Sequence, residues 1–369
     1  MVEHADATKF GSSMSSCLPL LVFHHHPGDG QEDAGDDEML MFSISKQSLH
    51  KNMEHDLLAA GSSMCWTTAQ GWILAQDRGT MSSSTCLWNP STGTKLPLPD
   101  LGEEHQIPYQ FRCLLSHKDP THPGCVVVLF NNAAPDLWYC HTTGDGDNSS
   151  RRWRRYSYDI GNHPSMPEPP KGRKARLRCR RRPTKNMITF MASVQGKIYF
   201  TNFTKGMCTM DFSSCNSTTT NHQNHPTFQK FNVPLANLPK GVSMGRHWLV
   251  ESQDQLFLVT TCFIGFDLNN IGTVTVHRMD FSSTQACWRS VHDIGDVVFL
   301  LEGTNMAASC SASALGLKAN QIFFMKDVMD DDADLCIFDL ETNTQQITRV
   351  HHHDNLILWR KPFWIVPPS

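Results

Sequence analysis

This chain of 369 residues lacks three sequence patterns. It has no long apolar run, no two cysteines close together, and almost no long stretch with the periodicity of a helix. Its longest apolar stretches are short, such as Cys125–Phe130, whereas a membrane-spanning helix needs about 20 apolar residues. The first residues also lack the basic start and the apolar centre of a secretory signal. We therefore expect no membrane partner, and a protein of the cytoplasm, the nucleus or both.

Cysteine pairs of the kind that bind zinc are also missing. The 13 cysteines are scattered, and the two closest in sequence, Cys208 and Cys215, are too far apart for a zinc knuckle. In a reducing compartment most of these thiols are expected to be small core residues. Charged residues make up only 18% of the chain and hydrophobic residues 40%, which is enough apolar material for a large core and excludes wholesale disorder.

Signatures of catalytic and cofactor sites do not occur either. The chain has no Gly-x-Ser-x-Gly elbow, no phosphate-binding loop, no His-Glu-x-x-His motif and no dinucleotide-binding glycine turn. His24–His26 and His351–His353 are poor zinc ligands, because adjacent strand residues point to opposite faces. Asp330–Asp332 and Asp334 lack the pattern of a calcium loop. The sequence predicts a non-enzymatic protein without a metal site or a cofactor.

The chain does contain a long series of short β-rich runs separated by turn residues. These runs are rich in Val, Ile, Phe, Tyr, Trp and Thr, and Gly, Pro, Asn, Asp and Ser bound them. Only Ser48–Ala60 is a plausible helix. Four runs end in Asn or Asp, with Thr or Ser three positions later. These pairs are Asn89 with Thr92, Asp211 with Ser214, Asp280 with Ser283, and Asp339 with Thr342.

This repeated unit predicts a turn within an antiparallel meander. The Asn or Asp side chain accepts backbone N–H groups just ahead of it, and the Ser or Thr hydroxyl caps the same reversal. One meander cannot bury both faces of its sheet, whereas several packed face to face around an axis can. At about 40–50 residues per blade, we expect an all-β propeller of four-stranded antiparallel blades. Six blades fit best, and five to eight are compatible with the length.

One domain is expected to hold almost the whole chain. We assign residues 1–16 to a disordered N-terminal tail, 17–358 to the propeller and 359–369 to a C-terminal tail. A basic, Pro-rich insertion loop is expected at about 160–186.

The insertion loop carries a dense run of positive charge. It can be read as a solvated loop, as a nuclear-import signal or as a contact for nucleic acid or an acidic partner. Its eight basic residues are Lys171, Arg173, Lys174, Arg176, Arg178, Arg180, Arg181 and Arg182.

Several segments resemble the plant family of F-box-associated β-propeller domains, which are kelch-like propellers. The matching stretches include Trp66–Leu101, Phe111–Phe130, Val276–Gly303 and Ser309–Asp327, of which the last two are the most specific. The resemblance extends from about residue 18 to 350. It implies a propeller that holds a protein target, and many members carry an N-terminal F-box that docks on a ubiquitin-ligase scaffold.

This sequence departs from the family at its beginning. An F-box needs roughly forty residues of amphipathic helix, as the resemblance implies, whereas Leu18–Leu21 is followed at once by histidines and an acidic, Gly-rich segment. We therefore expect no F-box, and the sequence does not predict docking on a ligase scaffold.

The expected function is a non-enzymatic module that binds a protein partner through loops at one end of the propeller channel. Two alternatives remain open at this point. One is a nucleic-acid-associated protein that uses the basic segment, and the other is a propeller-fold enzyme with residues gathered around the axis.

Overall fold

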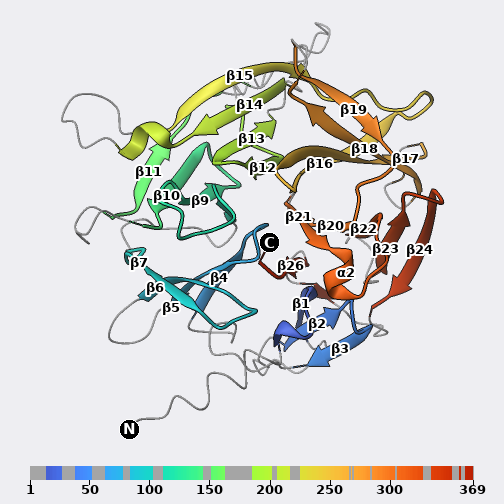
Figure 1. Ribbon diagram of the computed structural model, residues 1–369, viewed down its shortest axis with the longest axis horizontal. Helices are drawn as coiled ribbons and strands as arrows, with labels where there is room; N and C mark the ends of the chain where they lie inside the picture. Colours follow the sequence, from blue (N-terminus) through green and yellow to red (C-terminus); the bar gives the residue numbers. More distant parts are fainter. Residues whose placement is uncertain are drawn as a thin grey trace, which may run out of the picture.

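Six sheets surround a common axis in the computed structural model (Figure 1). The structure describes residues 14–26, 38–51, 63–77, 84–102, 111–143, 151–162, 185–201, 206–216, 225–265, 267, 270–282, 285–303, 306–326, 334–350, 357–358 and 362–368. Almost all of their regular structure is strand. The prediction of a six-bladed, all-β propeller is confirmed.

The blades are named A to F in chain order. Blade A contains β1 (Leu20–His26), β2 (Glu38–Ser43), β3 (Ser48–Lys51), β25 (Ile357–Leu358) and β26 (Phe363–Ile365). Blade B contains β4 (Ser63–Thr67), β5 (Ile73–Asp77), β6 (Ser84–Trp88) and β7 (Lys95–Leu98). Blade C contains β8 (Phe111–Leu115), β9 (Val126–Asn131), β10 (Asp136–His141) and β11 (Arg154–Ser157).

The second half of the chain forms the other three blades. Blade D contains β12 (Met191–Val194), β13 (Lys197–Thr201), β14 (Gly206–Asp211) and β15 (Thr227–Pro234), with η2 (Ser213–Asn216) after β14. Blade E contains β16 (Met244–Ser252), β17 (Gln255–Phe263), β18 (Ile271–Asp280) and β19 (Cys287–Val291). Blade F contains β20 (Val297–Leu301), β21 (Ala307–Ser311), α2 (Ala312–Leu315), β22 (Gln321–Met325), β23 (Asp334–Asp339) and β24 (Thr344–Arg349).

Each contact between neighbouring blades has its own hydrophobic cluster, so the core is divided into six parts. The alternation of side chains along a strand explains this division. In β1, Leu20 and Val22 pack toward blade B, whereas Leu21 and Phe23 pack toward blade F. Because both faces of a blade are apolar, each blade is stable only between two neighbours.

The C-terminal end of the chain closes the ring. β26 pairs with β1, with Ile365 opposite Leu20, and lies next to β4. The indole Nε1 of Trp364 donates to the carbonyl oxygen of Leu301 in blade F at 3.1 Å. The expectation of a C-terminal tail from residue 359 therefore fails for Phe363–Ile365, which form a buried inner strand. Three residues next to prolines are too short a pattern to predict as a strand.

Blade F has a fifth strand that lies close to the axis. Its order is β21-β20-β22-β23-β24, and β20 pairs parallel with β22. Parallel neighbours need a crossover connection, which here contains β21 and α2. β21 lies against β16, and its first residues, Ala307 and Ala308, are small and buried. Small side chains allow a strand to fit in this crowded place.

The one predicted helix is wrong where the structure describes it. Ser48–Lys51 form β3, which pairs with β2, while residues 52–60 lie outside the described part. Pairing with β2 outweighs the weak helical pattern of this stretch. No helix among the described residues has the length and apolar character needed to cross a membrane.

Candidate functional site

The four Asn and Asp residues of the repeated motif occupy equivalent turns. Each lies where the chain passes from the next-to-outermost strand of a blade to the outermost strand. Each Oδ1 accepts the backbone N–H of the residue two positions ahead, at 2.9 Å for Asn89, 2.8 Å for Asp211, 2.9 Å for Asp280 and 3.0 Å for Asp339. Because the four turns belong to four different blades, these side chains do not converge on a shared pocket.

The hydroxyl residues of the motif make local hydrogen bonds. The Thr92 and Thr342 hydroxyls each pair with the threonine two positions ahead, at 2.8 Å and 2.7 Å. The Ser214 hydroxyl donates to the carbonyl of His225 at 3.3 Å. Ser283 lies outside the described residues.

Blade A has an equivalent turn that the sequence pattern did not include. The Ser43 hydroxyl at the end of β2 accepts the backbone N–H of Lys46 at 3.2 Å. A search for Asn or Asp could not find it, because serine supplies the acceptor here. A search for any short polar side chain at the end of a strand, serine included, would have found this turn.

In blades A, D, E and F the residue directly after the turn acceptor crosses to the preceding blade. The ring of Phe212 in blade D lies 5.1 Å from that of Tyr139 in blade C. Leu340 of blade F belongs to the cluster shared with blade E, and Ile44 of blade A to the cluster shared with blade F. These three side chains are buried, with exposed fractions of 2%, 9% and 1% for Phe212, Leu340 and Ile44.

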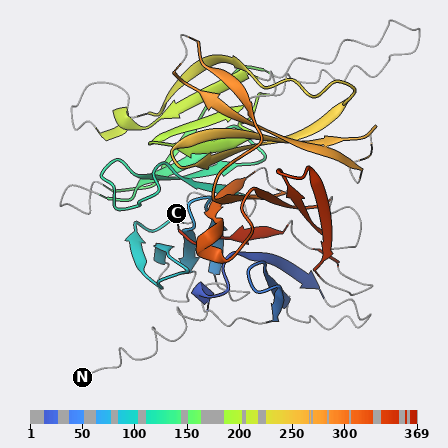
Figure 2. The same ribbon diagram turned by 45° about the vertical axis from the view of Figure 1, so that its right-hand side comes forward.

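Phe281 of blade E is the exception among these crossing residues. It follows Asp280 and reaches blade D, where its ring lies 5.7 Å from Tyr199 and 6.0 Å from Phe231. In spite of these contacts 44% of Phe281 is exposed. We call Tyr199, Phe231 and Phe281 the aromatic rim of blades D and E. Figure 2 shows the two blades, from light green to orange, next to each other.

The contact between blades D and E differs from the other five in its partly buried aromatic side chains. More partly buried aromatic side chains pack here than at any other described blade contact, namely Phe190, Tyr199, Phe231 and Trp288. Burial raises the pKa of the Tyr199 phenol, so its hydroxyl stays protonated at neutral pH. The aromatic rim therefore presents a neutral surface.

The turn that carries Phe281 is held by charge. The Ser282 hydroxyl and backbone N–H donate to Asp280 Oδ1 at 2.6 Å and 2.9 Å, and Arg289 Nε lies 3.1 Å from Oδ2. Hydrogen bonds from Ser282, and then the Arg289 guanidinium, lower the pKa of Asp280 to about 2. Asp280 is therefore ionised over the whole physiological range, and the turn keeps Phe281 in place.

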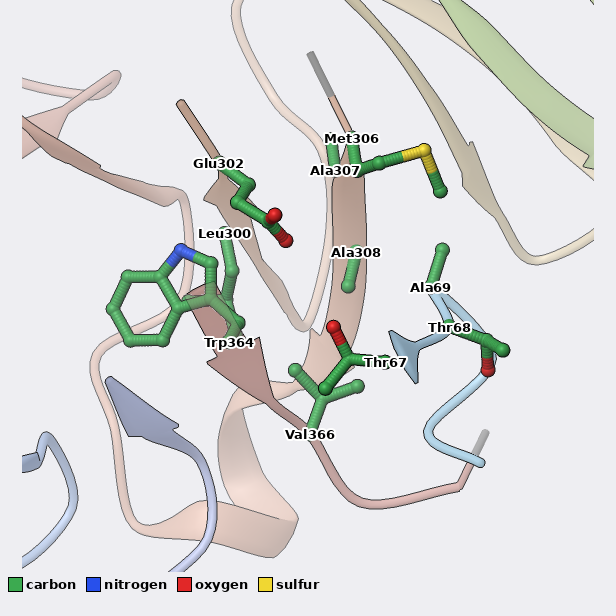
Figure 3. A pocket seen from close by; sticks show the side chains of 10 residues that line it. All are labelled: Thr67, Thr68, Ala69, Leu300, Glu302, Met306, Ala307, Ala308, Trp364 and Val366. Carbon is green, nitrogen blue, oxygen red and sulfur yellow. The ribbon is translucent and has the colours of Figure 1, made fainter. Parts of the chain in front are cut away.

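The axis of the propeller offers little space near blades A, B and F. A cavity there has about 10 Å³ for the centre of a water molecule, which is about the room of a single water. Figure 3 shows Glu302 and Trp364 on one side of it and Thr67, Thr68 and Ala69 on the other. A substrate or a partner side chain does not fit this cavity. The cavity therefore gives no support to the expectation that a partner binds at one end of the propeller channel.

A buried arginine on an innermost strand joins blades C and D. Arg112 on β8 donates through Nη2 to the carbonyl of Ile188 at 2.6 Å and through Nη1 to that of Thr189. Burial lowers the pKa of Arg112 to about 10, while Tyr158 and Glu302 act in the opposite direction. Sequence reasoning missed this residue because a single Arg in an apolar run carries no motif.

The basic segment lies outside the described residues, and so do His351–His353, Asp330–Asp332 and the side chains of His24–His26. The two described ends around the basic segment meet, because Asn162 and Lys185 form a bridge. In the part of the chain that the structure covers, no group of three or more His, Cys, Asp or Glu residues could hold a metal ion.

Comparison with protein families identifies the chain. Residues 41–339 match the family model described as the KIB1-4 beta-propeller. This chain belongs to the KIB1-4 β-propeller family. The match covers most of the chain and all six blades of this KIB1-4 propeller contribute to it. No curated protein matches the chain.

Solved structures of other proteins are similar to this KIB1-4 propeller only at a distance. TolB from Acinetobacter baumannii has 12% identity and a TM-score of 0.37, over 94% of this chain and 66% of TolB. A putative 6-phosphogluconolactonase from Bacteroides fragilis has 11% identity and a TM-score of 0.36, over 100% of this chain and 98% of that protein. Cps50 (Swd1) from Myceliophteria thermophila has 10% identity and a TM-score of 0.33, over 85% and 80%. Likeness at this level says nothing about activity.

Proposed function

We propose that this KIB1-4 propeller is a non-enzymatic protein-interaction module, and that the aromatic rim of blades D and E is its docking surface. The exposure of Phe281 carries this proposal. At the equivalent place in blades A, D and F the crossing side chain is buried, whereas 44% of Phe281 is exposed. Burial of that apolar area against a partner would be favourable.

The chemistry of the aromatic rim favours a protein as the partner. Aromatic side chains dominate the binding energy of protein interfaces, because they bury a large area at a low cost in conformational entropy. The rim combines Tyr199, Phe231 and Phe281 with the ionised Asp280 and Arg289 beside them. An apolar centre with charged residues at its margin is the usual anatomy of such interfaces.

The resemblance to F-box-associated propellers supports a narrower version of this proposal. In that version the partner is a target for ubiquitin ligation. The lifetime of the partner should then increase when this chain is depleted from cells. If the lifetime of the partner does not change, the partner is not a target for ubiquitin ligation through this chain. The broader proposal of partner binding would not be affected.

The docking surface can be tested with matched variants of the full chain. Each variant is fused to a proximity-labelling enzyme in cells of the source organism, after its melting temperature has been shown to match that of the wild type. Phe281→Ser should lose the labelled partner. Ile347→Ser removes a side chain that is 48% exposed on β24 of blade F, and it should keep the partner. Equal labelling by both variants would argue against the aromatic rim.

A further inference from the structure

The outer edges of the six blades differ in how well they are protected against pairing with a further strand. Every blade ends in an outermost strand, whose free edge exposes backbone N–H and C=O groups. The described outermost strands β3, β7 and β11 have 4 residues each, β19 has 5 and β24 has 6. β15 of blade D has 8 residues and is the longest of them. Figure 1 shows β15 on the outside of blade D.

Protein edges are usually protected by proline, by charge or by short length. β7 contains Pro97 in its middle, and β11 contains Arg154 and Arg155. β15 reads TFQKFNVP, with Lys230 as its single charged residue and with Pro234 only at its end. No described residue pairs with the outer edge of β15. β15 is therefore a long edge that is little protected against the addition of another strand.

The aromatic rim lies directly beside this edge. Phe231 of β15 pairs with Met207 on β14, and its ring faces Phe281 across the contact between blades D and E. In a β-sheet, alternate residues of neighbouring strands share one face. An extended segment added along β15 would therefore place every second side chain on the side of Phe231 and Phe281.

The opposite face of β15 adds a charge to this surface. Lys230 is exposed and points to the other face of the sheet from Phe231, one residue away. On an added strand, a side chain on that face would lie beside the Lys230 ammonium group. Opposite charges in neighbouring strands are favourable, whereas like charges are unfavourable. The edge thus favours an acidic residue next to an apolar one.

We propose that β15 is the acceptor edge for an extended segment of the protein partner, which adds to blade D as a fifth strand. One apolar side chain of the segment packs against Phe231 and Phe281, and an acidic residue next to it pairs with Lys230. The backbone of the segment supplies affinity and the two side chains supply specificity, as in other cases of strand addition. This inference rests on the proposed function and names the chemistry of its partner.

The first test uses a photo-crosslinking amino acid in the full chain, expressed in cells. It replaces Gln229 on β15 in one variant and Gln345 on β24 in the control, since both side chains are exposed on outermost strands. We expect the Gln229 variant to capture one segment of the proximity-labelled partner, and the Gln345 variant not to capture it. Capture of the partner only from Gln345 would overturn the assignment of the edge.

The second test uses the captured segment as a synthetic peptide, with binding to the purified chain measured by calorimetry. Methylation of the peptide backbone nitrogen at successive positions should abolish binding at every second residue and spare the residues between them, because only alternate N–H groups of an added strand face β15. Phe281→Ala should weaken binding about tenfold or more, and Ile347→Ala should leave it unchanged. Loss of binding without this alternation would exclude strand addition.

The outcomes separate the two proposals. A labelled partner that is captured away from β15, or a peptide without the alternating pattern, overturns strand addition and leaves the protein-interaction function in place. A wild-type chain that labels no partner at all overturns the proposed function, and strand addition with it.

Discussion

The ring centroid of Phe281 lies 6.0 Å from that of Phe231, and this contact joins the turn of blade E to the outermost strand of blade D. The contact places an aromatic residue across a blade boundary while leaving 44% of it exposed. It follows from the turn at Asp280, since the residue after the turn acceptor crosses to the preceding blade. One local motif thus connects blade packing with the surface proposed for docking.

The turn role of the motif predicts a loss of stability when the acceptor is removed. Asn89 is 8% exposed, and its Oδ1 accepts the N–H groups of Ser91 and Thr92 at 2.9 Å and 3.2 Å. Asn89→Ala should lower the free energy of unfolding by about 0.5–2 kcal/mol, as for other side-chain caps of backbone N–H groups. Urea denaturation measures this change. Asn89→Asp keeps the acceptor oxygen, as in three other blades, and should lower the free energy of unfolding less. Equal losses of stability in the two variants would contradict the turn role.

Arg112 should contribute more to stability than an exposed arginine. Arg112→Leu leaves the carbonyls of Ile188 and Thr189 without their donor, which should cost about 2–3 kcal/mol. Arg349→Leu is the control, because Arg349 is 46% exposed and its Nε lies 3.5 Å from Asp334 Oδ1, so this half-exposed pair should contribute less than about 1 kcal/mol. Chemical denaturation of both variants tests the difference. Similar losses would show that Arg112 does not hold blades C and D together.

Removal of the last strand should prevent closure of the ring. Deletion of residues 362–369 exposes blade A beside β1 and removes Trp364, Ile365 and Val366, which are 4%, 1% and 2% exposed. Each buried side chain of this kind contributes about 1.5–3 kcal/mol, and a whole domain is stable by only about 5–15 kcal/mol. The truncated chain should therefore lose its cooperative thermal transition in circular dichroism.

A milder variant of the same strand gives a graded result. Trp364→Phe keeps an aromatic ring but removes the donor to the Leu301 carbonyl, so it should fold with a stability lowered by about 1 kcal/mol. A truncated chain that melts like the wild type would show that the ring closes without β26.

The pH dependence of stability should come from three half-buried histidines. Burial lowers the pKa values of His117, His141 and His277 below the ordinary histidine value of 6.5. The positive charges of His122 and Arg154 lower those of His117 and His141 further. The unfolded chain therefore binds more protons than the folded chain below pH 6.5, so stability must fall as the pH falls.

The loss of stability should be complete when the pH has fallen below the lowered pKa values that these histidines have in the folded state. The carboxylates with lowered pKa values, such as Asp339, lose their contribution only below 3.8, so they do not interfere between pH 7 and pH 5. Melting temperatures across this range should decrease with acidity. His277→Leu should flatten the decrease, and the exposed control His292→Leu should not. A melting temperature independent of pH would contradict the prediction.

The sequence predicted the strands that have long alternating or fully apolar patterns. Val126–Asn131 and Gln255–Phe263 are strands of this kind, and both are rich in the strand-forming residues of the predicted β-rich runs. The innermost strands β4, β21 and β26 lack such a pattern. β21 reads AASCS, because small residues are needed near the axis, and small residues have little strand preference of their own.

The sequence by itself determined the blade architecture of this protein, because a repeated meander with an acceptor at its outer turn can bury both faces only in a ring. Only the tertiary structure decided where the chain end goes, which arginine is buried and which crossing side chain stays exposed. Those features depend on the neighbours that a residue meets across a blade boundary, and such neighbours are distant in sequence. The position of Phe281 between two blades could not be predicted from its own stretch of chain.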